Sequence, residues 1–140
     1  MTTTLTLKQA LLAVEYALEL AVQQYAGRPL SLAVCDVNGE LLSFARMDRA
    51  KLLTIELTQR KARTSSRLGC TTAAFLQRLQ KEQLDISYFG DPRFTALPGG
   101  IPILVEGKCI GAVAVGGLSA REDHDAAQAV ADKLLEEMTK

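Results

Sequence analysis

The sequence predicts an α+β fold in which a single antiparallel β-sheet of four to five strands is flanked by helices. Two observations carry this prediction: two pairs of strand-like segments are each joined by a short turn, and helical segments precede, separate and follow these pairs. Strands joined by so short a turn must pair antiparallel. Helices outside the hairpins then cover the sheet in two or three layers. With 140 residues, the chain suits a single domain spanning residues 1–140.

A helix is predicted first, over about residues 6–26. Thr6 and Gln9 have the spacing of a capping box, in which the two residues satisfy each other's free backbone N–H groups. Gly27 and Pro29 then end the helix. Six apolar residues recur at helical spacing before that end: Leu11, Val14, Leu18, Ala21, Val22 and Tyr25.

A β-hairpin follows, with strands over residues 30–36 and 40–47. Asn38 and Gly39 lie in the turn between them, and this pair tolerates the positive φ angles of a type I′ turn. Because side chains alternate along a strand, we expect Leu42, Phe44 and Arg46 to share one face.

Two helices are predicted next, over about residues 49–68 and 71–83, separated by Gly69 as a left-handed helix end. The second has an apolar stripe of Phe75, Leu76 and Leu79. Residues 85–96 are predicted to be irregular, because turn-forming residues occur at 90–92.

Six of the ten glycines fall between Gly99 and Gly117, and they surround a second hairpin with strands over residues 101–105 and 109–115. Ser119 and Glu122 form another capping-box pattern, which opens the last helix. That helix carries four apolar residues at helical spacing: Ala127, Val130, Leu134 and Met138.

Composition excludes several classes of protein. The 16 basic and 16 acidic residues give a formal net charge of +0, which argues against nucleic-acid binding. No apolar run approaches the length of a membrane span, and residues 1–4 lack the basic start of a signal peptide. We therefore expect a cytoplasmic location and no membrane partner. The three cysteines form no C-x-x-C pair, so a zinc site is not expected.

Two glycine-containing segments are candidate anion sites. Gly99 and Gly100 follow Pro98 in a stiff loop whose backbone N–H groups could hold a carboxylate or a phosphate, although the loop also suits a tight strand entry without a ligand. Ser119 opens a helix whose N-terminus favours anions, although its simpler role is that of an N-cap.

Two further features rest on charged side chains. Arg60, Arg63 and Arg67 share one helical face, and guanidinium groups suit carboxylates, including the propionates of a tetrapyrrole. A solvated face or a subunit contact is the alternative interpretation. His124 is the only histidine and could bind a metal or haem iron or act as a pH switch. A single histidine gives no ligand spacing, so we predict no metal site and keep a non-functional histidine as the alternative.

Several segments together resemble the GlcG/HbpS-like family, which includes the C-terminal domain of PduO-type proteins. They are DVNG at 36–39, FARMD at 44–48, KART at 61–64, LPGGIPI at 97–103 and GAVAVGG at 111–117, leading to Asp123. The resemblance spans nearly the whole chain in family order. It implies a profilin-like domain with α/β/α layers that assembles into homo-oligomers. It also implies an association with glycolate, propanediol or glycerol utilisation, with haem bound by some members and corrinoids linked to others.

We therefore expect a homo-oligomeric ligand-binding or accessory protein with no established catalytic residues. Its expected ligand is haem, cobalamin or another tetrapyrrole, or a small anionic carboxylated molecule. Backbone amides would hold the anionic group while Lys61 or Arg63 neutralises it. The predicted ligand-binding residues are Lys61, Arg63, Thr64, Pro98, Gly99, Gly100, Ser119, Asp123 and His124.

Two alternatives belong to other functional classes. One is a small enzyme that acts on a short hydroxy- or keto-acid, with Asp123 or His124 as the base. The other is a structural partner of a dehydratase system, which would use the helical faces as interfaces.

Overall fold

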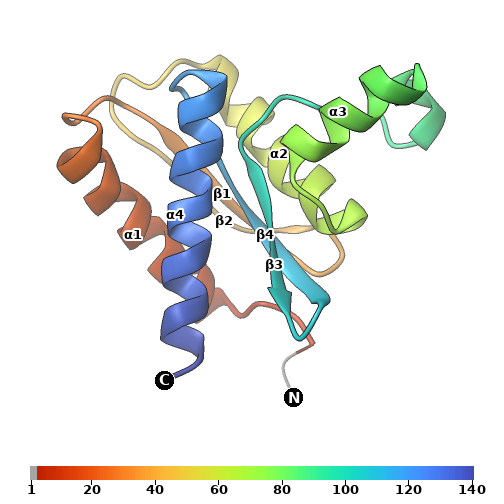
Figure 1. The fold of residues 1–140 in the computed structure, drawn as a ribbon. Coiled ribbons are helices and arrows are strands. Elements are labelled where there is room, and N and C mark those ends of the chain that lie inside the picture. Colours follow the sequence, from red (N-terminus) through yellow and green to blue (C-terminus); the bar gives the residue numbers. More distant parts are fainter. Residues whose placement is uncertain (1–2) are drawn as a thin grey trace.

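The computed structural model describes residues 3–140 as one sheet with helices on both faces. Its helices are α1 (Leu7–Gln24), α2 (Leu53–Leu68), α3 (Thr72–Glu82), the short 3-10 helix η1 (Ile86–Phe89) and α4 (Ala120–Met138). Its strands are β1 (Ser31–Asp36), β2 (Leu41–Arg46), β3 (Gly100–Val105) and β4 (Lys108–Gly116). Figure 1 shows the order of these elements along the chain.

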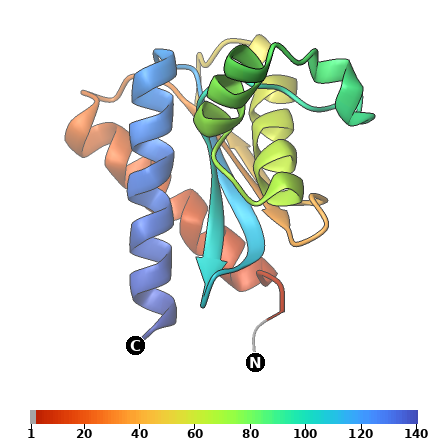
Figure 2. The ribbon, with the colours of Figure 1, turned by 45° about the vertical axis from the view of Figure 1, so that its right-hand side comes forward.

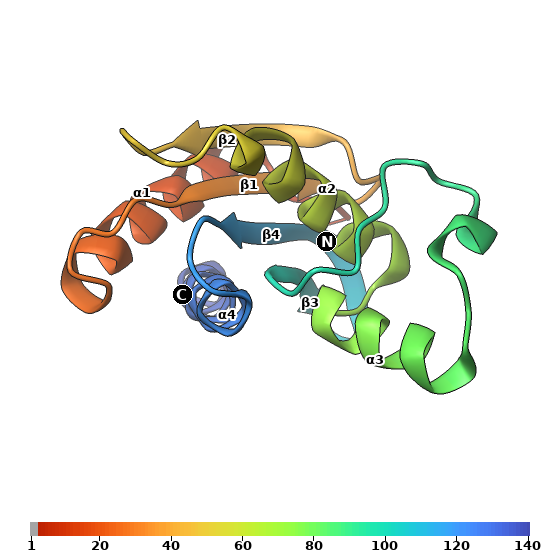
Figure 3. The ribbon, with the colours of Figure 1, turned by 90° about the horizontal axis from the view of Figure 1, so that it is seen from above.

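The four strands are all antiparallel and lie in the order β2-β1-β4-β3, as Figure 3 shows from above. Helices α1 and α4 pack on one face of the sheet, whereas α2 packs on the other and α3 lies beside α2 (Figure 2). The predicted α+β fold with one antiparallel sheet in α/β/α layers is therefore confirmed. Pro102 is tolerated within β3 because β3 is an edge strand.

The main core lies between the sheet and the pair α1 and α4. The strands supply branched aliphatic side chains, and α1 contributes only small ones to its buried positions: Ala10, Ala13, Ala17 and Ala21. Alanine lets the helix backbone approach its neighbours closely, because it has no side chain beyond Cβ. Ala127, Val130 and Leu134 of α4 are buried as well, as their spacing predicts.

The outward face of α1 carries large apolar side chains, whereas the outward face of an amphipathic helix is expected to be polar. Of the six apolar residues predicted to recur along α1, only Ala21 is fully buried. Four large apolar side chains of α1 instead face solvent, and we call them the α1 stripe: Leu7 (56% exposed), Leu11 (52%), Leu18 (41%) and Val22 (68%). They fall within one sector of the helix, on the basis of roughly 100° per residue.

A β-bulge at Leu42 changes the predicted facing of β2. Leu41 and Ser43 pair with consecutive residues of β1, so Leu42 between them has no partner. Leu42 packs with the core on the α1 side, whereas Phe44 packs with a small cluster on the α2 side. The expectation that Leu42 and Phe44 share a face is therefore wrong, because the bulge interrupts the two-residue alternation.

The predicted turn between β1 and β2 is present, but its type differs. Gly39 has a positive φ of 82°, whereas Asn38 does not have a positive φ. The Asp36 carboxylate accepts hydrogen bonds from the amides of Asn38 and Glu40 at 2.9 and 3.0 Å. The loop is therefore a three-residue turn that ends in a left-handed glycine, which is a common alternative to type I′.

Other boundaries follow the local capping chemistry. Thr6 and Ser119 make the predicted capping boxes at the starts of α1 and α4. Helix α2 begins at Leu53 and has no side-chain cap, four residues later than the start predicted near residue 49. The segment predicted to be irregular contains η1.

Two neighbouring residues of β3 test the assignment of the core. Ile103 is fully buried, whereas Leu104 is 43% exposed. Ile103→Ala should lower the free energy of unfolding by about 2–5 kcal/mol, since it leaves a cavity in the core. Leu104→Ala should change the free energy of unfolding by less than about 1 kcal/mol in the same urea denaturation measurement. Equal losses in the two variants would contradict this assignment.

Candidate functional site

Four of the predicted ligand-binding residues meet at one place between α2, β3 and α4. They are Lys61, Gly99, Gly100 and Asp123. Lys61 Nζ donates to Asp123 Oδ2 at 3.0 Å and to the Val115 carbonyl at 3.0 Å. Lys61 is only 2% exposed and Asp123 only 4%. Two of the four predicted residues, Lys61 and Asp123, therefore form a closed, buried ion pair.

Gly99 lies directly against this ion pair. Its φ is 131°, and a Cβ there would lie 2.6 Å from the Val115 carbonyl oxygen and 2.8 Å from Lys61 Nζ. Any side chain at this position would therefore displace the ammonium group or the strand, which explains why a glycine is required.

The backbone amides near the ion pair already have partners within the chain. The Gly100 N–H donates to Thr72 Oγ1 at 3.0 Å, and the Leu118 N–H donates to Asp123 Oδ1 at 2.9 Å. Ser119 Oγ accepts from the Glu122 N–H at 3.2 Å, so the first turn of α4 is capped by its own side chains. These donors hold the ion pair and the helix start in place.

Burial acts on both charges of the pair. It lowers the pKa of the Lys61 ammonium and raises the pKa of the Asp123 carboxyl, and in each case the charge of the partner opposes the shift. The hydrogen bonds to Val115 and Leu118 give both charged groups a second partner, as a charge in a dry environment requires.

The other predicted residues are distributed around this cluster. Thr64 Oγ1 donates to the Arg60 carbonyl at 2.7 Å and accepts from the Thr95 N–H at 3.0 Å. Pro98 is half-buried beside Gly99. His124 is half-buried on the first turn of α4, and within residues 3–140 its buried Nδ1 has no hydrogen-bond partner. Ligand contact by any of the nine predicted residues stays a prediction.

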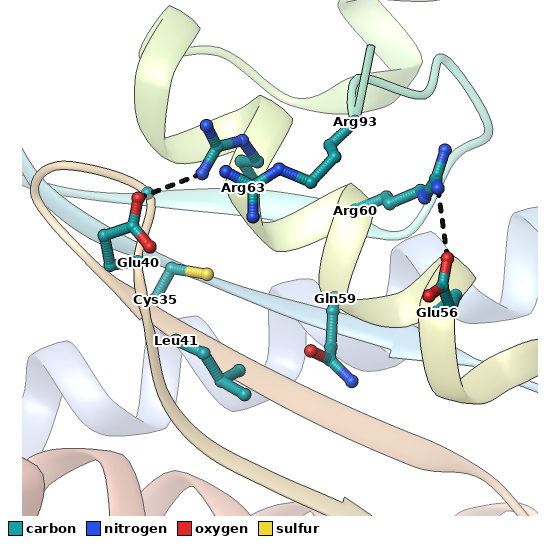
Figure 4. Close-up of a pocket in the computed structure, with 9 residues that line it drawn as sticks. Cys35, Glu40, Leu41, Glu56, Gln59, Arg60, Arg63 and Arg93 are labelled. Atoms are coloured by element: carbon teal, nitrogen blue, oxygen red, sulfur yellow. Dashed lines mark hydrogen bonds and ion pairs between the residues drawn. The ribbon is translucent and has the colours of Figure 1, made fainter. Parts of the chain in front are cut away.

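Arg63 belongs to a different feature, which we call the arginine cavity. It has a volume of about 200 Å³ and opens between the β1–β2 hairpin, α2 and the loop before β3 (Figure 4). The residues that matter for its chemistry are Cys35, Glu40, Glu56, Arg60, Arg63 and Arg93. Lys61 and Arg63 lie two positions apart on α2, roughly 200° around the helix, so they point to different surroundings.

Carboxylates hold two of the three guanidinium groups in fixed positions. Arg63 Nε lies 2.8 Å from Asp91 Oδ2, and Arg63 Nη1 lies 3.2 Å from Glu40 Oε1. Arg60 Nη2 lies 3.0 Å from Glu56 Oε2. Such charge-assisted contacts fix the orientation of the planar guanidinium fork.

Arg93 is the exception in this cluster. It is an exposed residue that extends from the loop toward Arg63 (Figure 4), and within residues 3–140 its side chain has no hydrogen-bond or ion-pair partner. Its backbone N–H donates to Asp91 Oδ1 at 2.9 Å. Burial of Asp91 acts to raise its pKa, but this hydrogen bond and the Arg63 guanidinium outweigh burial and hold the pKa below its usual value.

The inner wall of the arginine cavity is neutral. Cys35 is 2% exposed, and burial raises the pKa of its thiol to about 12. The thiol is therefore protonated at neutral pH, and it is neither a competing anion nor an activated nucleophile.

Sequence reasoning included Arg63 but missed Arg93, Glu40 and Asp91. Arg93 is a single arginine in an irregular loop and has no partner at helical or strand spacing. Glu40 and Asp91 reach Arg63 from 23 and 28 residues away along the chain. The turn-forming residues at 90–92 were the one local signal, and they indicate a turn rather than an ion pair.

Residues 3–140 contain neither a metal-binding cluster nor a membrane-spanning helix. Histidine, cysteine and acidic side chains nowhere gather in this range in a group of three that could bind a metal ion. None of the helices in this part of the chain combines the length and apolar character needed to span a membrane.

Comparison with known proteins gives the family. Residues 5–132 match the family described as "Haem degrading protein HbpS-like", and the chain therefore belongs to the HbpS-like family. Protein GlcG of Escherichia coli (strain K12) is 34% identical over 86 residues, which cover 61% of this chain and 63% of GlcG. The chain thus matches less than two thirds of the length of GlcG. An uncharacterized 15.0 kDa protein from the dhaT–dhaS intergenic region of Citrobacter freundii is 30% identical over 106 residues, covering 74% of this chain and 75% of that protein.

Solved structures agree with this membership. A crystal structure of HbpS is 31% identical with a TM-score of 0.84, covering 96% of this chain and 92% of that chain. A double mutant of Streptomyces reticuli HbpS is 30% identical with the same TM-score, covering 96% and 89%. The PduOC–haem complex is 23% identical with a TM-score of 0.81, covering 92% and 94%, and at this identity it shows the shared fold alone.

The buried ion pair generates a stability prediction. Lys61→Met leaves Asp123 buried without its cation and should lower the free energy of unfolding by about 3–5 kcal/mol in urea denaturation. The double variant Lys61→Met/Asp123→Asn removes both charges while keeping an acceptor for the Leu118 N–H, so it should be more stable than Lys61→Met alone. A loss below about 1 kcal/mol in Lys61→Met would contradict the role given to this pair.

Proposed function

We propose that this protein binds a haem-type tetrapyrrole and does so as a homo-oligomer. The observation that carries the proposal is the α1 stripe, whose four large apolar side chains are 41–68% exposed in the single chain. Large apolar side chains that are exposed within one sector of a surface helix often mark a protein or ligand interface. A second copy of the chain is the occupant that the resemblance to oligomeric relatives favours.

The sizes of the cavities support binding at such a shared surface. The arginine cavity measures about 200 Å³, and a neighbouring surface cavity that shares Arg63 and Arg93 with it measures about 380 Å³. Cavities for drug-sized ligands measure roughly 300–1,000 Å³, and a tetrapyrrole needs the upper part of that range. We therefore place the macrocycle against the α1 stripe, where a partner chain would cover its other side.

The exposed apolar residues of α1 are suited to contact with the macrocycle. Leu11, Leu18 and Val22 offer apolar contact for a flat ring system. The only histidine, His124, lies on α4, and within residues 3–140 its Nδ1 lacks the partner that usually orients a ligating imidazole. We accordingly assign the ring contact to α1 and assign no iron ligand.

Haem is favoured over cobalamin because the family description names haem and names no corrinoid. The association with glycolate, propanediol or glycerol utilisation, a dehydratase partner and a cytoplasmic location remain part of the proposal. A binding function is favoured over an acid–base enzyme because Asp123 is 4% exposed and occupied by Lys61.

Substitution of the α1 stripe tests the proposal. By light scattering during size-exclusion chromatography, the wild-type protein should be larger than a monomer, whereas Leu11→Glu should shift it toward the monomer because it places a charge in the interface. Titration with haemin should give the wild-type protein a saturable change in the Soret band, and Leu11→Glu should weaken that change at least about tenfold. Cobalamin serves as the comparison ligand.

The matched control is Leu53→Glu, which places the same charge on a 70% exposed leucine of α2. This control should change neither the mass nor the titration. A monomeric wild-type protein would contradict the oligomer, and the absence of a saturable Soret change would contradict the haem ligand.

A further inference from the structure

We propose that the arginine cavity is a binding site for a short monocarboxylate, separate from the tetrapyrrole surface on α1. The site lies on the α2 side of the sheet, whereas the α1 stripe lies on the other side. The two proposals therefore depend on different residues and can fail separately.

Within the described part of the chain, the ion pairs of the arginine cluster leave one guanidinium group available for an anion. Four guanidinium groups gather there, from Arg60, Arg63, Arg67 and Arg93. Three carboxylates form ion pairs with them, those of Glu40, Glu56 and Asp91. The Asp36 carboxylate lies on the same hairpin turn and accepts from the Glu40 N–H at 3.0 Å. Among these four arginines, Arg93 is the one whose side chain pairs with no carboxylate within residues 3–140.

The geometry of the cluster is already organised for a carboxylate. Asp91 and Glu40 fix Arg63 at 2.8 and 3.2 Å, and Glu56 fixes Arg60 at 3.0 Å, so these side chains need little rearrangement on binding. Arg93 supplies the free fork that can bind both oxygens of a carboxylate. A carboxylate beside Arg93 would also relieve the repulsion among the three guanidinium groups that line the cavity.

Volume and lining limit the size of the acid. A space of about 200 Å³ is below the roughly 300–1,000 Å³ typical of sites for drug-sized ligands, so an acid of a few carbon atoms is favoured. Leu41 and the neutral thiol of Cys35 line the same cavity and offer apolar contact to the carbon end of such an acid.

The acidic residues at the rim disfavour more highly charged anions. Glu40 and Glu56 both line the cavity, and both are exposed at its opening. A phosphate dianion would bring two negative charges to the one guanidinium group left unpaired within residues 3–140, that of Arg93, and would lie near these carboxylates. The structure therefore favours a monocarboxylate over a phosphate.

Isothermal titration calorimetry with propionate, acetate and inorganic phosphate, at constant ionic strength, tests this proposal. Propionate should bind the wild-type protein saturably and more tightly than phosphate. Arg93→Gln should weaken propionate binding at least about tenfold, and Arg93→Lys should lie between the two because it keeps the charge but loses the fork. Arg121→Gln is the matched control, since the Arg121 side chain is 92% exposed on α4, and it should bind as the wild-type protein does.

Three outcomes would overturn the monocarboxylate site. The first is the absence of saturable heat with propionate. The second is equal affinity of Arg93→Gln and the wild-type protein for propionate, and the third is tighter binding of phosphate than of propionate. Leu11→Glu separates this proposal from the tetrapyrrole proposal, because it should bind propionate normally whatever its response to haemin.

Discussion

The packing of α2 and α4 around the end of β4 depends on the buried ion pair between Lys61 and Asp123. The pair joins α2 to α4, and its hydrogen bonds to Val115 and Leu118 fix the end of β4 and the segment before α4. A buried charge that loses its partner is strongly destabilising, so every group around the pair is constrained. Gly99 is the clearest case, since only a hydrogen fits between its Cα, the Lys61 ammonium and the neighbouring strand.

Helix α2 consequently has two faces with different surroundings. Lys61 points into a sealed interior, whereas Arg63, two residues later, reaches an open cavity together with Arg60. The ion pair holds the helix against the sheet, and this fixes the position of the arginines relative to the β1–β2 hairpin. The α1 stripe is on the opposite face of the sheet, so the two proposed binding surfaces lie on different sides of it.

Local chemistry made much of the fold predictable, and long-range packing decided the rest. The capping boxes at Thr6 and Ser119 predict two helix starts, because their partners are three residues away. The outward face of α1 could not be predicted, since apolar residues occupy both of its sides and only packing selects the alanines for burial. Arg63 was a candidate from its type and helical position, but its carboxylate partners come from distant turns, and Arg93 had no local pattern at all.

Amine labelling of the native protein at neutral pH, read by mass spectrometry, tests most directly the claim that the ion pair is sealed. Acetylation with an N-hydroxysuccinimide ester should modify exposed lysines such as Lys51 and Lys81 readily, while Lys61 reacts only when the protein unfolds. Protection of Lys61 alone among these lysines would agree with a sealed pair. Modification of Lys61 at the same rate as Lys51 in the folded protein would contradict the claim, and with it the division of α2 into a sealed and an open face.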